Sequence, residues 1–143
     1  DWQKAAHVYS DEVLISHRTD AEKGTPKFER GKSLSDYQCE MIYISGTAAI
    51  RGEESIVTGD VLVQTEITLE NIQHLIGLEE GREKLPEHSG KLELLRVYLK
   101  HEEDAKIVKE DMDKLCPDVP IVYLYADVCR EELLVEIEGI AYL

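Results

Sequence analysis

The chain has 143 residues, 43% apolar and 32% charged, and its 16 Lys and Arg against 30 Asp and Glu give a formal net charge of −14 at pH 7. This length fits one compact domain, and the apolar fraction can build a core beneath a strongly solvated surface. A field of this sign repels phosphates, so we do not expect a nucleic-acid partner.

Neither membrane insertion nor secretion is indicated by the sequence. The longest run without Asp, Glu, Lys or Arg, residues 41–50, has ten residues, whereas a membrane-spanning helix needs roughly twenty apolar ones. No signal-like start is present, so we expect no membrane partner and a cytoplasmic location. The chain begins at Asp1 rather than Met, which indicates processing or a piece of a longer protein.

The cysteine and histidine patterns predict no metal centre, disulfide framework or cofactor. Cys39, Cys116 and Cys129 are an odd number at wide spacings without a C-x-x-C pair. No two of the five histidines stand at the i, i+4 spacing that places two imidazoles on one helix face.

The first part of the chain is the least regular. A short apolar run at residues 13–15 predicts a strand, and the polar segment 21–27 predicts a connector. We therefore assign residues 1–37 to an N-terminal strand and connector, and residues 38–143 to one α+β domain. In that domain residues 41–44 predict a buried strand that ends in a turn at 45–47.

Two helices and three further strands follow. Apolar residues at helical spacing predict a helix over 61–76 with Asp60 as its N-cap and an end near Gly77. A second amphipathic helix is predicted with an apolar stripe from Ala105 to Leu115, and residues 102–104 are acidic and lie in its first turn, where the helix dipole favours them. The predicted strands are 92–100, 120–128 and 133–142.

This element order predicts an α+β sandwich in which both helices cover one face of a mixed sheet. No helix remains for the other face. We therefore expect that face to pack against further copies of the chain in a closed cyclic oligomer.

Two acidic residues stand out on the final strand. Alternation places Glu136 and Glu138 on one face, about 7 Å apart, opposite Val135, Ile137 and the small residues after them. In a cleft or an interface, desolvation and mutual repulsion would raise at least one pKa and create a proton donor. On a face that meets water, the same pair would be ordinary.

Neighbouring residues could complete a site. Tyr123 and Tyr125 would line a pocket or pack as interface aromatics, and Cys129 is more consistent with a packed thiol than with a nucleophile. Three cations could hold an anionic substrate, although such side chains are often simply solvated: Arg51, Arg96 and Lys100.

Three segments in chain order resemble the RidA/YjgF superfamily, which also carries the label endoribonuclease L-PSP: I-Y-I-S-G-T at 42–47, G-D-V-x-x-Q-T-x-x-x-L-E-N-I at 59–72 and L-V-E-I-E-G-I-A at 134–141. The resemblance implies a chorismate-mutase-like fold assembled as a homotrimer with small-molecule clefts between subunits. It also places Gly46 in the site. The arginine on which RidA-type imine and enamine hydrolysis depends falls at Ile121 here, and isoleucine cannot anchor a carboxylate. Nuclease activity is not expected, since nothing is arranged for phosphate contact.

The chain is more similar still to the C-terminal half of the chorismatases, which release pyruvate from chorismate. The similar segments are S-G-T-A-A-I-x-G-x-E-S at 45–55, R-V-Y-L-K at 96–100 and A-D-V-C-R-E-E-L-L-V-E-I-E-G at 126–139. The resemblance implies that Glu136 is the catalytic proton donor and that Cys129 is a pocket residue. Glu53 departs from it, since we expect a histidine there, and chorismatases are about twice as long.

We therefore expect a hydrolase that acts on a small enolpyruvyl carboxylate of the chorismate type. Glu136 would donate the proton, and Arg96, Lys100, Tyr123, Tyr125 and Glu138 would line the substrate site. The alternatives are a RidA-type deaminase, which Ile121 disfavours, and a non-catalytic trimer that binds small carboxylates or partner proteins.

Overall fold

The computed structural model describes residues 30–35, 40–52, 54–77 and 91–142. These form a five-stranded sheet in the order β1-β2-β7-β5-β6, a two-stranded sheet and two α-helices. The bounds are β1 Gly31–Ser35, β2 Glu40–Thr47, β3 Ile50–Arg51, β4 Glu54–Ser55, α2 Val61–Leu75, β5 Lys91–Leu99, η1 Glu102–Asp104, α3 Ala105–Leu115, β6 Ile121–Tyr125 and β7 Val135–Tyr142. The strand and connector expected at 13–15 and 21–27 lie outside the described residues.

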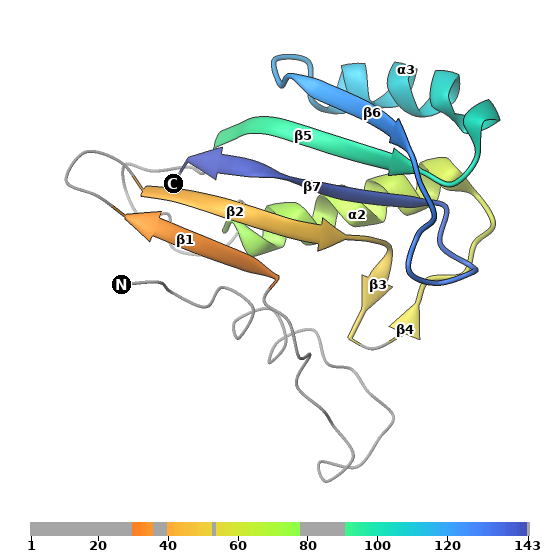
Figure 1. The fold of residues 1–143 in the computed structure, drawn as a ribbon, viewed down its shortest axis with the longest axis horizontal. Coiled ribbons are helices and arrows are strands. Elements are labelled where there is room, and N and C mark those ends of the chain that lie inside the picture. The colour runs from red at the N-terminus through yellow and green to blue at the C-terminus, as the bar shows by residue number, and fades with distance from the viewer. Residues whose placement is uncertain (1–29, 36–39, 53, 78–90, 143) are drawn as a thin grey trace, which may run out of the picture.

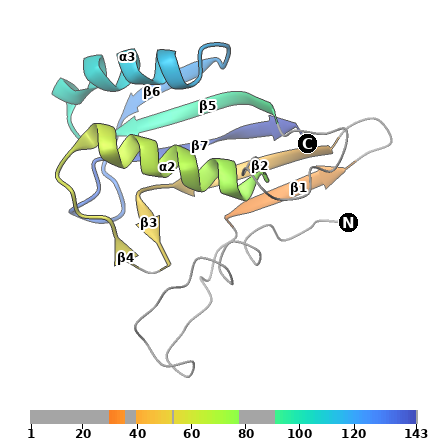
Figure 2. The same cartoon turned by 180° about the vertical axis from the view of Figure 1, so that it is seen from behind.

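The main sheet is mixed, and the two helices share one of its faces. β1, β2, β7 and β5 pair antiparallel with their neighbours, while β6 pairs parallel to β5. Figure 2 shows α2 and α3 in front of the sheet, and Figure 1 shows the opposite face, which no described helix covers. The predicted α+β class, with a mixed sheet and two helices, is confirmed.

Alternation along β5 and β7 decides which face holds the core. Leu95, Val97 and Leu99 of β5 are fully buried, as are Val135 and Ile137 of β7. They pack with apolar residues of α2 and α3 in one cluster, and each fully buried Leu, Ile or Val contributes ~1.5–3 kcal/mol of hydrophobic stabilisation. The residues between them face the other way, as the alternation predicts.

Both helices begin and end near the predicted residues. Asp60 caps α2 by accepting hydrogen bonds from the backbone N–H groups of Leu62 (2.9 Å) and Val63 (3.4 Å). The acidic residues before α3 form the short 3₁₀ turn η1. Among the described residues, no helix has the length and apolar character that a membrane crossing requires.

The structure corrects three expectations about strands. β1 was not expected as a strand, and it extends the sheet upstream of the boundary placed at residue 38. Residues 45–47 are not a turn but the last part of β2. β6 ends at Tyr125, so residues 126–128 belong to the loop that leads to β7.

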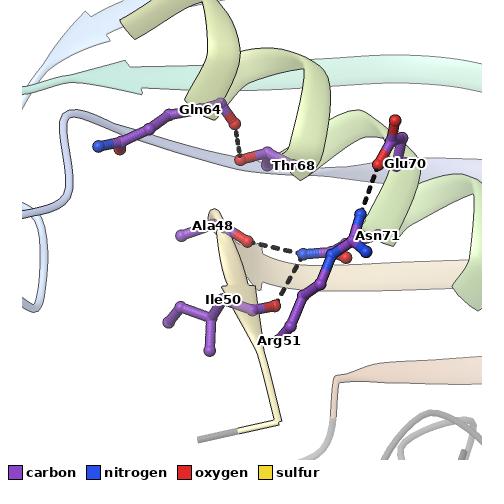
Figure 3. Close-up of polar contacts among 7 residues, drawn as sticks. All are labelled: Ala48, Ile50, Arg51, Gln64, Thr68, Glu70 and Asn71. Atoms are coloured by element: carbon purple, nitrogen blue, oxygen red, sulfur yellow. Dashed lines mark hydrogen bonds and ion pairs between the residues drawn. The ribbon is translucent and has the colours of Figure 1, made fainter. Parts of the chain in front are cut away.

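Two buried side-chain amides of α2 hold the segments that follow β2 and precede β7. Asn71 Nδ2 donates to the carbonyls of Ala48 and Ile50, each at 2.9 Å (Figure 3). Gln64 Nε2 donates to the Glu132 carbonyl at 3.0 Å, and Gln64 Oε1 accepts from the Leu134 N–H at 2.9 Å. The exit of β2 and the entry to β7 are therefore tied to the same helix.

Candidate functional site

A cluster of charged and polar side chains occupies the open face of the sheet, where β5 and β7 pair. The antiparallel register places Arg96 opposite Glu138 and Tyr98 opposite Glu136. Directly paired residues project from the same face of a sheet. All four side chains therefore lie together on the face away from the helices.

Glu138 is held by two neighbours on β5. Arg96 Nε lies 2.7 Å from Glu138 Oε1, and the Tyr98 hydroxyl donates to the same oxygen. The Glu138 side chain is 25% exposed and that of Arg96 is 49% exposed, so this pair is screened less than a fully solvated one. The hydrogen bond to Glu138 raises the pKa of Tyr98, and the hydroxyl therefore stays a donor.

Glu136 has a different environment from Glu138. It is half-buried, and burial first, then the nearby charge of Glu138, raises the pKa of the Glu136 carboxyl, while Arg30 lowers it. Desolvation and a like charge both favour the protonated acid. The two carboxyl groups of this strand thus have different surroundings, since Glu138 contacts a guanidinium and the pKa of Glu136 is raised.

A β-bulge brings glycine against Glu136. Ile44 pairs with Gly139 and Thr47 with Ile137, so Ser45 and Gly46 of β2 stand opposite the single residue Glu138. Bulges of this kind redirect side chains and are common beside active sites. A β-carbon at residue 46 would lie 2.0 Å from Glu136 Oε1, so the predicted site residue Gly46 does adjoin Glu136.

Arg30 adds a cation that sequence reasoning missed. Its carbonyl accepts the Ser45 N–H at 2.9 Å, which fixes its backbone beside the bulge. Together with Thr47, Ala48 and residues of α2, it lines a small hollow at this end of β2. No signal in the sequence pointed to Arg30, because the strand that follows it was not predicted.

Two of the predicted binding residues, Lys100 and Cys129, follow the ends of β5 and β6. Lys100 Nζ donates to the Glu131 carbonyl at 2.5 Å. Cys129 is an exposed free thiol in the loop between β6 and β7.

The third candidate cation is not part of the cluster. Arg51 pairs with Glu70 of α2 at 2.8 Å, on the helix side of the chain (Figure 3).

Tyr123 and Tyr125 do not share a face with Glu136, contrary to the site drawn from the sequence. The parallel register pairs Tyr123 with Val97 and Tyr125 with Leu99, which both face the core. Tyr123 packs against the core cluster, and burial is the main cause that raises the pKa of Tyr123 to about 12. Their strand contributes Val122 and Leu124 to the open face instead.

The cluster is suited to proton transfer. A half-buried carboxyl whose pKa is raised by burial and by a neighbouring carboxylate can serve as a general acid. Among the residues that the structure describes, no three His, Cys, Asp or Glu side chains are grouped as a metal site requires.

Comparison with known proteins identifies relatives. No family model matches the chain. A chorismatase of Streptomyces rapamycinicus is 36% identical over 136 residues, which cover 90% of this chain and 41% of the relative. A 3-hydroxybenzoate synthase of Streptomyces hygroscopicus is 36% identical over 128 residues, which cover 80% of this chain and 36% of the relative. The chain thus spans well under half the length of these curated relatives.

Solved structures show the same fold. A chorismatase crystal structure superposes with a TM-score of 0.65 and 30% identity, over 79% of this chain and 35% of that one. A member of the YjgF/YER057c/UK114 family from Mycobacterium tuberculosis superposes with a TM-score of 0.60 and 19% identity, over 81% of this chain and 86% of that one.

Proposed function

We propose that this chain, a RidA/YjgF-superfamily protein related to the chorismatases, takes part in hydrolysis of a chorismate-type enolpyruvyl carboxylate with Glu136 as the proton donor. One observation carries the proposal. Glu136 is half-buried beside the Arg96–Glu138–Tyr98 cluster, and its pKa is raised by burial and by the Glu138 charge. The names of the relatives supply the substrate class.

The reaction needs an acid that can protonate carbon. Glu136 would transfer its proton to the terminal methylene carbon of the enolpyruvyl group, which leaves an oxocarbenium-like centre at the ether carbon. Water adds to that centre, and one of its protons returns to the Glu136 carboxylate. The hemiketal hydroxyl then gives its proton to the ring oxygen as the bond between that oxygen and the former ether carbon breaks, which yields pyruvate and the ring alcohol.

Anions must be held near this acid despite a formal net charge of −14. Arg96 is half-exposed while it pairs with Glu138, and Arg30 lies close enough to lower the pKa of Glu136. Arg96 lies on β5 and Arg30 directly precedes β1. Arginine at such positions can bind carboxylates in bidentate fashion.

We further propose that neighbouring copies of the chain cover the open face, as a homotrimer. That face carries partly exposed apolar side chains around the cluster, namely Leu34, Tyr43, Val122, Leu124 and Tyr142. Apolar surface of this kind is typical of protein contacts. Coverage would remove water from Glu136 and favour its protonated form further.

The decisive experiment is incubation of the protein with chorismate and measurement of pyruvate. We expect turnover in the wild-type protein and its loss, by a factor of at least about 100, in Glu136→Gln. Glu66→Gln, an exposed position on α2, is the matched control and should keep wild-type turnover. Turnover that survives Glu136→Gln would refute the assignment of the proton donor.

The residues that the structure describes do not favour the deaminase alternative. Ile121, which stands where RidA-type enzymes carry their anchoring arginine, begins β6 and packs against the core cluster. β6, Ile121–Tyr125, contains no arginine that could take over this role.

A further inference from the structure

The two acids of β7 differ in the side chains that contact them. Arg96 and Tyr98 both reach from β5 to Glu138, although the register places Tyr98 directly opposite Glu136. Glu136 instead lies against the bulge of β2, where Gly46 offers no side chain. Strand register alone therefore does not explain why both Arg96 and Tyr98 contact Glu138; the conformations of the side chains also decide it.

We propose that Glu138, which Arg96 and Tyr98 hold in place, is a positioning residue that keeps the proton on Glu136, and that Arg96 limits this effect. The inference rests on the proposed function for its catalytic meaning. The effect of the Glu138 charge on the protonation of Glu136 is a property of the protein without substrate, so it can be measured in the absence of substrate.

Arg96 and Tyr98 supply two donors to one oxygen of Glu138. A guanidinium at 2.7 Å from a carboxylate oxygen forms a charge-assisted bond that favours the ionised acid. The Tyr98 hydroxyl adds a second donor to the same oxygen. Glu138 is thus supplied with the donors that an anion needs, whereas burial of Glu136 penalises its charge.

Glu136 and Glu138 are close enough for their charges to interact. Residues i and i+2 of a strand lie about 7 Å apart on one face. At that range one negative charge disfavours another, even in a surface environment. Glu138 therefore opposes ionisation of Glu136, and Arg96 reduces that opposition by neutralising part of the Glu138 charge.

Other groups near Glu136 must be accounted for. Arg30, ahead of β1, favours ionisation of Glu136. Directly after β5, Lys100 donates to the Glu131 carbonyl, and β2 contributes the uncharged bulge. None of these groups changes when Glu138 or Arg96 is substituted, so their contributions cancel in a comparison of variants.

Two substitutions should move the titration of Glu136 in opposite directions. Glu138→Gln removes the neighbouring charge and should lower the midpoint by about half a pH unit or more. Arg96→Gln leaves the Glu138 charge without its partner and should raise the midpoint. A loss of packing alone would not give opposite signs.

The experiment is a carbon-13 NMR titration of glutamate side-chain carboxyls in the protein without substrate. The Glu136 signal is assigned by its disappearance in Glu136→Gln, and Glu66→Gln on α2 serves as the control for loss of one charge on the other side of the sheet. Opposite shifts, each larger than the control shift, are expected. A Glu136 midpoint that does not fall in Glu138→Gln, or does not rise in Arg96→Gln, would overturn the proposal.

Each variant predicts its own direction for the shift of the Glu136 titration midpoint. If one variant fails to fold, the other can still contradict the proposal. The result is also separable from the proposed function. If pyruvate is never released but the two shifts occur, the enzymatic proposal fails while the control of Glu136 by Glu138 stands. If turnover requires Glu136 but neither shift occurs, Glu138 has no positioning role.

Discussion

Gly46 of β2 leaves the space that the Glu136 carboxyl of β7 occupies, since a β-carbon at residue 46 would lie 2.0 Å from Glu136 Oε1. The nearest atoms all belong to this one flexible side chain. The fold can therefore accept alanine by moving the Glu136 side chain alone. Glycine is required here for space, because Gly46 is not among the glycines with positive φ in the described residues.

We predict that Gly46→Ala preserves the fold and lowers kcat by a factor of ten or more, because an acid displaced by about 1 Å loses its alignment with the reacting carbon. Circular dichroism and pyruvate release measure the two effects. The control is the same substitution in a Glu136→Gln background, where no further loss should follow. An additional loss in that background would show that Gly46 acts through another residue.

A second prediction concerns stability and pH. The raised pKa of Glu136 means that the folded state binds its proton more tightly than the unfolded state does. The stabilisation is complete below the unfolded-state pKa and is lost as pH rises through the raised, folded-state pKa. At pH 8 Glu136→Gln should therefore raise the free energy of unfolding, because it removes a carboxylate whose charge is penalised in the folded state.

Urea denaturation at pH 8 and at pH 5 measures this difference. The gain from Glu136→Gln should shrink at the lower pH, where wild-type Glu136 becomes protonated. A gain that grows toward low pH would mean that the Glu136 pKa is lowered in the folded protein. Activity should follow the same group, with turnover falling as pH rises through the Glu136 pKa.

The faces of the long strands could be predicted because side-chain alternation is a local property. Val97 and Leu99 are fully buried, and Arg96 and Glu136 lie on the open face, as the spacing indicates. The helix starting after Asp60 could be predicted from its cap and its apolar spacing. These features depend only on residues that are close in the sequence.

Partners across the sheet could not be predicted in this way. That Glu138 meets Arg96 depends on the order in which β7 and β5 pair, and this order is set by the whole fold. The same limit misplaced Tyr123, because alternation within β6 does not say which of its faces meets the helices. β1 was missed since Gly31–Ser35 contains no β-branched or aromatic residue.

A third prediction addresses the support of the site by α2. Asn71 donates to two carbonyls of the segment that follows β2, at 2.9 Å each. Asn71→Ala leaves both carbonyls buried without this donor and should lower the free energy of unfolding by about 2–3 kcal/mol. Arg51→Ala breaks the neighbouring exposed pair with Glu70 and should cost less than about 1 kcal/mol. Equal losses in the two variants, measured by urea denaturation, would contradict this ranking.

The fourth prediction tests the homotrimer. Val122 of β6 faces the open side of the sheet and is 47% exposed, while Ile107 of α3 is 43% exposed on the helix side. If neighbouring copies cover the open face, a charge at Val122 would be buried without a partner in the assembly, which is costly. A charge at Ile107 would stay in water.

Sedimentation equilibrium should therefore give the mass of three chains for the wild-type protein and for Ile107→Glu, and the mass of one chain for Val122→Glu. Because coverage helps to exclude water from Glu136, Val122→Glu should also lose turnover while keeping its circular dichroism spectrum. A wild-type mass of one chain would show that the open face is not an interface between copies. A trimer that tolerates Val122→Glu would place the contact elsewhere on the molecule.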